Sequence, residues 1–165
     1  MDLFLLRHGI AVEPGLGNYR DSERPLTTEG RQKMRLIAET LKALEMNFDL
    51  VLSSPFVRAR QTAEIVCEVL GQTQKLKFSQ LLAVDGDPKK MIHEVEKHKA
   101  SSVLLVGHEP YLSTIISILV TGEHDQYFVM KKGGLCKLSV DSLRFGRCAI
   151  LEWLAPPKIL IRKSS

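Results

Sequence analysis

The chain has 165 residues, of which 44% are hydrophobic and 25% are charged, a composition typical of one ordinary globular domain. Its net charge of +4 is not arranged as a basic stripe with interleaved aromatic residues, so the sequence argues against a nucleic-acid partner. Its longest apolar stretch, Leu112 to Val120, is far below the roughly 20 residues that span a bilayer, so we expect no membrane association.

The first third of the chain predicts a strand, a loop and a helix. A continuous apolar run over residues 2–7 is typical of a strand that is buried on both faces of a parallel sheet. Residues 10–26 are punctuated by prolines and glycines and predict a loop. From about Thr28 to Met46, apolar residues recur at helical spacing. The predicted buried stripe of this helix consists of Met34, Ile37, Ala38, Leu41 and Leu44.

The second strand is predicted over residues 49–53, and the helix after it has signals at both ends. Ser54 has the character of an N-cap, and Pro55 suits the first position of the helix. We expect this helix to continue to Leu70, with Gly71 as its stop signal.

The next segments repeat the alternation of strand and helix. A weaker strand is predicted near residues 76–82, and Asp87-Pro88 predicts the start of another helix by the same cap-and-proline pattern. Residues 102–107 predict a fourth strand, and a largely buried helix is expected over residues 110–121.

The last third of the chain differs. Residues 134–140 and 147–154 predict two strands joined by a short turn, and therefore an antiparallel pair at one side of the sheet. The preceding alternation predicts a three-layer α/β domain with a mostly parallel sheet. We expect one domain over residues 1–154, followed by a tail over residues 155–165 that is either a docked strand or a loose end.

The cysteines and the amino terminus favour a cytoplasmic protein. Cys67, Cys136 and Cys148 are an odd number of widely spaced thiols, as expected for reduced cysteines. The first apolar run has four residues before Arg7, which is too short for a secretory signal. Nothing in the pattern indicates an obligate dimer, so we expect a monomer.

Polar motifs follow three of the predicted strands at the point where each strand ends. These motifs are Arg7-His8-Gly9, Ser53-Ser54-Pro55 with Arg58 shortly after, and Gly107-His108-Glu109-Pro110. A single histidine after a strand is usually a solvated turn residue. Three such motifs together are more informative, because the carboxyl ends of parallel strands meet at the edge where open α/β sheets bind ligands.

Two arginines and two histidines at one edge suit a phosphoryl group. Arg7 and Arg58 supply planar donors that bind phosphate oxygens in pairs, and the starts of the two adjacent helices add positive dipole ends. Neighbouring guanidinium groups lower the pKa of an imidazole, which suits His8 as a nucleophile. His108 is expected to hydrogen-bond the phosphoryl oxygens best in its protonated form. Gly9 lets a ligand approach the backbone closely.

The motifs together resemble the histidine phosphatase superfamily, which includes the phosphoglycerate mutases. The short chain length and the sequence around Arg24 and Arg58 are most similar to those of SixA-type phosphohistidine phosphatases. The resemblance covers residues 1 to about 154 and implies a phosphoglycerate mutase-like αβα domain with one antiparallel strand. It rests on Arg7-His8-Gly9, Arg24-Pro25-Leu26-Thr27 with Gly30, Ser53-Ser54-Pro55-x-x-Arg58-Ala59-x-Gln61-Thr62-Ala63, and Gly107-His108-Glu109.

By position, the resemblance implies His8 as the phosphorylated nucleophile, with Arg7, Arg58 and His108 forming the phosphate site around it. Arg24 matches a family arginine near the mouth of the site, and we assign it to substrate binding. The resemblance implies no metal and no organic cofactor.

One stretch departs from the wider family. Many phosphomonoesterase members carry a glutamate just after the third strand as general acid, whereas residues 81–87 contain none. Asp85, Asp87 and Glu109 are candidate substitutes, and the sequence selects none of them. A site without a dedicated acid favours cleavage of a P–N bond, because imidazole can be protonated near neutral pH whereas an alkoxide is a poor leaving group.

We therefore expect a metal-independent phosphatase that acts on a phosphohistidine-containing signalling or phosphotransfer protein, through a covalent phosphohistidine on His8. Phosphate and its mimics are expected to bind in the same site. The first alternative is a phosphomonoesterase for a small phosphorylated metabolite, with a nearby carboxylate as acid. A mutase is disfavoured, because the chain has no insertion that would close the site.

Two further classes stay open. A catalytically silent phosphate-binding module is disfavoured, because a binding module needs no nucleophile. A metallohydrolase would use His8, His108 and Glu109 as ligands, although two flanking arginines repel a divalent cation.

Overall fold

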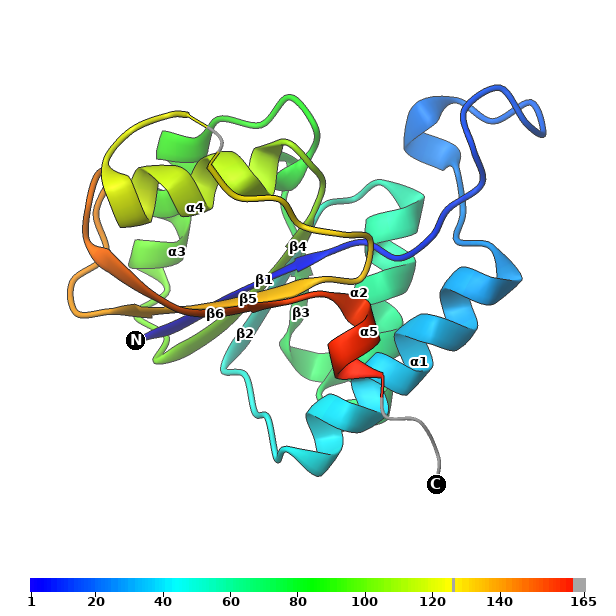
Figure 1. Cartoon of the computed structure of the whole chain (residues 1–165), viewed down its shortest axis with the longest axis horizontal. Coiled ribbons are helices and arrows are strands. Elements are labelled where there is room, and N and C mark those ends of the chain that lie inside the picture. Colours follow the sequence, from blue (N-terminus) through cyan, green and yellow to red (C-terminus); the bar gives the residue numbers. More distant parts are fainter. Residues whose placement is uncertain (126, 162–165) are drawn as a thin grey trace.

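The structure is a computed structural model that describes residues 1–125 and 127–161. A six-stranded sheet with the order β3-β2-β4-β1-β5-β6 lies between two layers of helices (Figure 1). Four strands are parallel: β1 (Asp2–Arg7), β2 (Leu50–Ser53), β3 (Leu76–Phe78) and β4 (Ser102–Gly107). β5 (Leu135–Val140) runs antiparallel to both of its neighbours, β1 and β6 (Ala149–Ala155). The structure confirms the predicted three-layer fold with one antiparallel strand.

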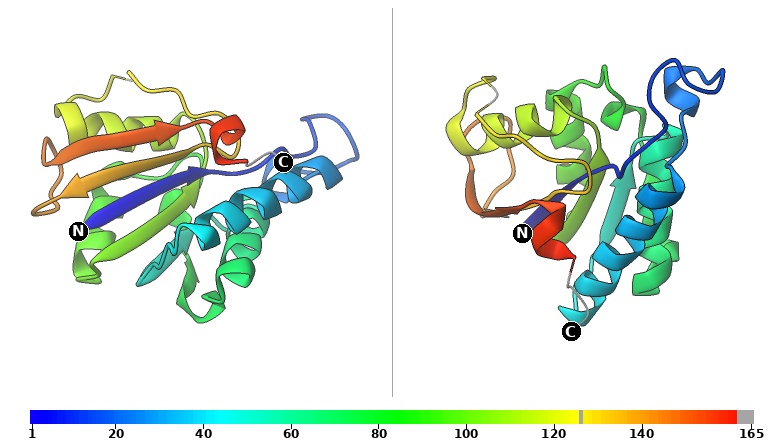
Figure 2. Two further views of the ribbon diagram at one scale, coloured as in Figure 1. Left: turned by 60° about the horizontal axis from the view of Figure 1, so that its bottom comes forward. Right: turned by 45° about the vertical axis from the view of Figure 1, so that its right-hand side comes forward.

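The helices cover both faces of the sheet, as the views in Figure 2 show. Successive residues of β1 point to opposite faces, so Leu3 and Leu5 belong to one buried cluster and Phe4 and Leu6 to the other. This explains why the strand is apolar at every inner position rather than alternating. The first cluster includes α3 (Pro88–Lys97) and α4 (Tyr111–Thr121), and the second includes α1 (Thr28–Ala43), α2 (Val57–Leu70) and α5 (Pro157–Leu160).

Two helix boundaries differ from the prediction. α1 ends at Ala43 rather than near Met46, because Glu45 has a positive φ of 55° that breaks the helix. Leu44 is therefore exposed and does not join the predicted stripe. α2 begins at Val57, so Ser54 is not its N-cap and Pro55 lies before the helix.

The boundary signals at Gly71 and at Asp87-Pro88 are confirmed, whereas the strand predicted near residues 76–82 ends at Phe78. Gly71 ends α2 in the left-handed conformation, with φ 69°. The Asp87 carboxylate accepts hydrogen bonds from the backbone N–H groups of Lys89 and Lys90 at the start of α3.

The segment after β6 packs on the domain as a short helix rather than as a strand. β6 extends to Ala155, and α5 places Leu160 in the cluster that contains α1 and α2. Residues 162–165 of the expected tail lie outside the described residues. Within the part of the chain that the structure describes, no helix is long and apolar enough to cross a membrane.

The sheet register brings the three strand ends together. β1 and β2 both pair with β4, with Arg7 opposite Gly107 and Ser53 opposite Val106. The residues that follow the three strands therefore start from the same edge of the sheet, at nearly the same level.

Candidate active site

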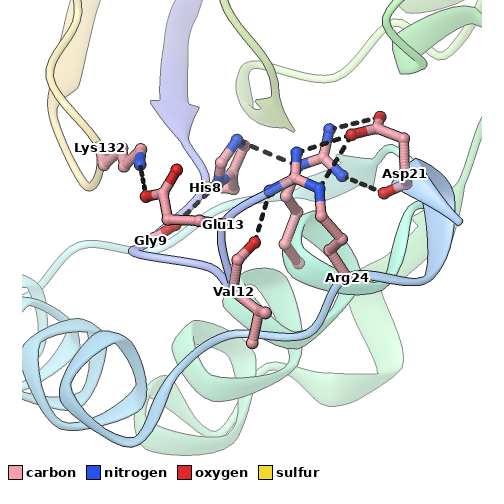
Figure 3. Close-up of polar contacts among 8 residues, drawn as sticks. His8, Gly9, Val12, Glu13, Asp21, Arg24 and Lys132 are labelled. Atoms are coloured by element: carbon pink, nitrogen blue, oxygen red, sulfur yellow. Dashed lines mark hydrogen bonds and ion pairs between the residues drawn. The ribbon is translucent and has the colours of Figure 1, made fainter. Parts of the chain in front are cut away.

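His8 follows β1 and is buried, with 6% of its surface exposed. Its Nδ1 lies 2.7 Å from the carbonyl oxygen of Gly9, which can only accept a hydrogen bond, so Nδ1 carries the ring proton. Nε2 accepts a hydrogen bond from Nε of Arg58 at 3.3 Å (Figure 3). The two contacts define a neutral imidazole whose Nε2 lone pair faces a guanidinium group.

Arg58, the second residue of α2, lies between His8 and the turn at Asp21–Glu23. Its Nη1 donates to the carbonyl oxygen of Asp21 at 2.6 Å, and its Nη2 donates to the Asp21 carboxylate at 3.2 Å. The Phe56 ring lies 5.3 Å from its guanidinium carbon, in a cation–π contact. The guanidinium is therefore fixed in orientation, which suits paired hydrogen bonds to phosphoryl oxygens.

His108 follows β4 and is also buried, with its ring centroid 5.2 Å from that of His8. Its Nε2 lies 2.8 Å from Oγ of Ser54. This hydroxyl accepts a hydrogen bond from the backbone N–H of Phe56, so its own proton can be donated to Nε2. That arrangement favours a ring proton on Nδ1, which has no hydrogen-bond partner among the described residues.

Arg7, the last residue of β1, is anchored from the opposite side of His8. Its Nη1 donates to the carbonyl oxygen of Met130 at 2.8 Å, in the segment that leads into β5. Its Nε is buried without a hydrogen-bond partner among the described residues. Such an N–H group is available to an incoming acceptor.

Burial controls the charge of both histidines. It lowers the pKa of His8 to about 2, and the charges of Arg58 and Arg7 contribute in the same direction against the opposing hydrogen bond to Gly9. Burial, followed by the charge of Arg58, lowers the pKa of His108 to about 3. Both rings are therefore neutral at pH 7 in the ligand-free protein, so His108 would donate through Nδ1–H without the protonation expected from the sequence.

Gly9 has a packing role that the sequence did not reveal. A Cβ atom at this position would lie 2.7 Å from Cγ of Met34, so the space beside Gly9 is filled by α1. Its backbone N–H donates to Thr62 Oγ1 at 3.1 Å, and its carbonyl holds His8. These contacts position the nucleophile candidate, and a direct contact of Gly9 with substrate stays a prediction.

Arg24 lies at the edge of the site and faces Asp21 rather than His8. Its Nε and Nη2 donate to the Asp21 carboxylate at 2.9 Å and 2.7 Å, and its Nη1 donates to the carbonyl of Val12 at 2.7 Å. Glu13 pairs with Lys132 at 3.3 Å, which joins the loop over residues 10–26 to the segment before β5 (Figure 3).

The sequence does not indicate Asp21, and it predicts a different role for Ser54 from the one that the structure shows. No pattern pointed to Asp21, because it lies in a loop without periodicity. The sequence predicts Ser54 as a helix cap, whereas its hydroxyl contacts His108. Its place directly after β2 was the signal that could have identified it. The histidines outside the motifs, His93, His98 and His124, are exposed.

The three candidate acids have other positions. Glu109 accepts hydrogen bonds from the backbone N–H and the hydroxyl of Ser113 in α4. Asp87 caps α3, and Asp85 is exposed in the turn before that helix. The carboxylate that contacts Arg58 is that of Asp21.

The donor set of a metal centre does not form around His8. Among residues 1–125 and 127–161, no three His, Cys, Asp or Glu side chains are grouped so that they could hold a metal ion. The bonds of Glu109 to Ser113 explain why it does not join His8 and His108 in such a group.

Comparison with known proteins agrees with the fold and with the motifs. Residues 3–82 match the family model of the histidine phosphatase superfamily (branch 1). The phosphohistidine phosphatase SixA of Escherichia coli is 34% identical over 131 residues, which cover 78% of this chain and 80% of that protein. The chain therefore belongs to the histidine phosphatase superfamily, and it is a phosphatase with a phosphoglycerate mutase-like fold.

Solved structures place the chain more closely within that superfamily. The protein histidine phosphatase SixA in complex with tungstate has a TM-score of 0.84 and 28% identity, covering 97% of this chain and 99% of that one. A phosphoserine phosphatase of Entamoeba histolytica in complex with phosphoserine has a TM-score of 0.72 at 19% identity, covering 95% and 98%, and shares the fold alone. The SixA-type resemblance predicted from the motifs is confirmed.

Proposed function

We propose that this chain is a phosphohistidine phosphatase, which removes the phosphoryl group from a histidine of a protein through a covalent intermediate on His8. The observation that carries the proposal is the state of the His8 ring. Its proton is held on Nδ1 by the Gly9 carbonyl, and its Nε2 lone pair becomes available for attack when a phosphoryl group accepts the Nε–H of Arg58 in its place. SixA of Escherichia coli, 34% identical, is itself a phosphohistidine phosphatase, which supports this substrate class.

In the first step, Nε2 of His8 attacks phosphorus in line, and the P–N bond to the substrate imidazole breaks. The electron pair of that bond stays with the leaving nitrogen. The guanidinium groups of Arg58 and Arg7 and the Nδ1–H of His108 are the donors for the three phosphoryl oxygens. Catalysis of this kind depends on positioning and on charge stabilisation, and buried donors supply both.

In the second step, water attacks the phosphorus of the His8 intermediate. The P–Nε2 bond breaks, the electron pair returns to Nε2, and both protons of the water leave with the phosphate as dihydrogen phosphate. The bond from Nδ1–H to the Gly9 carbonyl persists through both steps and keeps the ring oriented. The same arginines remain paired to phosphate until it leaves.

The nearby carboxylates favour a P–N bond over a P–O bond. Partial burial opposes ionisation of Asp21, but the hydrogen bond from Arg24 and the charge of Arg58 outweigh it and lower the pKa of this carboxyl. An ionised carboxylate cannot protonate an alkoxide. Glu109 accepts hydrogen bonds from Ser113, and Asp87 accepts hydrogen bonds from the N-terminus of α3. Neither carboxylate therefore replaces the general acid that an ester substrate needs.

The test is phosphate release, with a chelator present, from a histidine-phosphorylated phosphotransfer domain and from para-nitrophenyl phosphate. We expect fast release from the protein, slow release from the ester, and loss of at least 1,000-fold in both for His8→Ala. His98→Ala is the matched control, because His98 is an exposed histidine directly after α3.

Three results would overturn the proposal. Full activity of His8→Ala would exclude a covalent intermediate on His8. Comparable rates on the two substrates indicate the alternative, a phosphomonoesterase for small metabolites. Loss of activity with the chelator indicates a metallohydrolase.

A further inference from the structure

Among the residues that the structure describes, Asp21 is the one carboxylate that contacts both Arg58 and Arg24. It accepts from Nη2 of Arg58 at 3.2 Å and from Nε and Nη2 of Arg24 at 2.9 Å and 2.7 Å. The Arg58 side chain is 4% exposed, whereas that of Asp21 is 55% exposed. The carboxylate therefore forms the outer end of a chain of contacts that begins at His8 and passes through Arg58 (Figure 3).

In the ligand-free protein, Asp21 occupies donors that a phosphoryl group needs. Nη1 of Arg58 donates to the backbone carbonyl of Asp21, Nη2 donates to the Asp21 carboxylate, and Nε donates to His8. These bonds use three of the five N–H groups of the guanidinium, so a phosphoryl group binds through the two that remain or displaces the carboxylate. A bound phosphoryl group also lies near a second negative charge, which weakens the binding of any simple phosphate anion.

Asp21 lies on the outer side of the candidate site. The Arg58 guanidinium joins Nε2 of His8, at 3.3 Å, to the Asp21 carboxylate, at 3.2 Å, and the carboxylate is the exposed end of this chain. A phosphoryl group that is attacked by the buried His8 and bound by Arg58 directs its leaving group outward, toward the side where Asp21 lies. A group at that place acts on the leaving atom or on the ring that carries it.

The chemistry of the leaving group decides whether this carboxylate helps or hinders. When the ring nitrogen of phosphohistidine that is not phosphorylated carries a proton, the P–N bond breaks to release neutral imidazole rather than imidazolate. A carboxylate that accepts a hydrogen bond from this N–H stabilises the protonated ring. Nitrophenolate leaves without a proton and has no N–H, so for this ester the carboxylate is only a repelling charge.

We propose that Asp21 is a specificity-determining residue, which selects substrates with an imidazole leaving group by competing with simple phosphate anions for Arg58 while accepting the ring N–H of phosphohistidine. This inference rests on the proposed function and deepens it. It assigns the preference for P–N bonds to one side chain at the mouth of the site rather than to the mere lack of an acid.

The experiment compares wild type with Asp21→Asn, which keeps the shape of the side chain and removes its charge. The substrates are 1-phosphoimidazole, which has the leaving ring without a protein around it, and para-nitrophenyl phosphate. Glu23→Gln is the matched control, because Glu23 is a carboxylate of the same turn and pairs with Arg20. Calorimetry with inorganic phosphate measures the competition for Arg58 without any turnover.

We expect Asp21→Asn to lower the ratio of kcat/KM for 1-phosphoimidazole over kcat/KM for the ester by about tenfold. We also expect the Kd for phosphate to fall at least threefold, whereas Glu23→Gln leaves both quantities within twofold of wild type. A ratio that falls by less than threefold, or a phosphate Kd that does not fall, overturns the role of Asp21.

The failures of the two proposals are distinguishable. If the wild-type protein releases no phosphate from either 1-phosphoimidazole or a histidine-phosphorylated protein, the proposed function is wrong and the role of Asp21 is wrong with it. If wild type cleaves both and the ratio does not change in Asp21→Asn, the role of Asp21 alone is wrong.

Discussion

The candidate site has two parts that differ in how they are held. The floor consists of Arg7, His8, Arg58 and His108, which sit at the ends of β1 and β4 and at the start of α2. The rim is the loop over residues 10–26. The sheet register fixes the floor, and His8, Arg58 and His108 are each at most 6% exposed. The rim is held to the floor mainly through side chains. A rigid floor with a separately attached rim allows the reaction and the choice of substrate to vary independently.

The largest effect is expected where the floor and the rim meet. Arg58→Ala removes the donors to the phosphoryl group and the anchor of Asp21 together. We expect kcat/KM on a phosphohistidine protein to fall about 1,000-fold. Arg58→Lys recovers little of this loss, because an ammonium group cannot form the paired bonds of a guanidinium.

Arg60→Ala is the control for this substitution. Arg60 lies two residues further along α2, where it is exposed and pairs with Glu64. A loss of activity of similar size in Arg60→Ala would show that α2 as a whole, rather than the guanidinium group of Arg58, supports the reaction.

The floor could be predicted from the sequence, because its residues follow strands whose apolar runs identify them. Residues 2–7 and 102–107 were predicted with the bounds that the structure has. Adjacent parallel strands then require their ends to meet, and α/β sheets bind ligands at that edge. This reasoning places His8 and His108 together without any knowledge of contacts.

The rim could not be predicted in the same way. The loop over residues 10–26 has no hydrophobic period, so nothing in the sequence tells which of its polar side chains turns inward. The hydrogen bonds of Asp21 with Arg24 and Arg58 depend on the folded path of the loop. Ser54 shows a related limit: a serine before a proline has the pattern of a helix cap, and only the structure shows its bond to His108.

The second prediction concerns the attachment of the rim to α1. A Cβ atom on Gly30 would lie 2.0 Å from the carbonyl oxygen of Ile10, which also accepts from the backbone N–H of Thr27. Gly30→Ala must therefore displace the loop or the start of the helix. We expect urea unfolding to show a loss of about 3 kcal/mol in the free energy of unfolding.

Arg31→Ala provides the comparison for Gly30→Ala, because Arg31 is the next residue of α1 and its side chain is exposed. Unchanged stability of Gly30→Ala would mean that the close approach of the rim to α1 does not exist in solution.

The third prediction concerns pH, and it reports on the floor. The pKa values of His8 and His108 are lowered from 6.5 to about 2 and about 3 in the folded protein. Between these values and 6.5 the unfolded chain binds protons that the folded protein does not, so stability falls as pH falls below 6.5. From pH 7 to pH 5 each histidine is expected to contribute a loss of about 2 kcal/mol.

Urea unfolding at pH 7 and at pH 5 measures this loss. In His8→Gln, the free energy of unfolding should differ between pH 7 and pH 5 by about 2 kcal/mol less than in wild type. His98→Gln, which replaces an exposed histidine, should keep the wild-type difference. An unchanged difference in His8→Gln would contradict the burial of a neutral His8.

The smallest effect is expected at Ser54, which acts on the floor through His108. Ser54→Ala removes the hydroxyl that lies 2.8 Å from Nε2 of His108 and leaves the ring without a partner that fixes its tautomer. The loss of one such hydrogen bond corresponds to about tenfold in kcat/KM. The ring ¹⁵N chemical shifts of His108 should move from the Nδ1–H pattern toward a mixture of tautomers.

Ser53→Ala is the matched control, because the Ser53 hydroxyl is equally buried and bonds to the Ser54 carbonyl rather than to a histidine. If Ser53→Ala lowers activity as much as Ser54→Ala while the His108 shifts stay unchanged, the end of β2 supports the floor by packing, and the tautomer of His108 is set by another group.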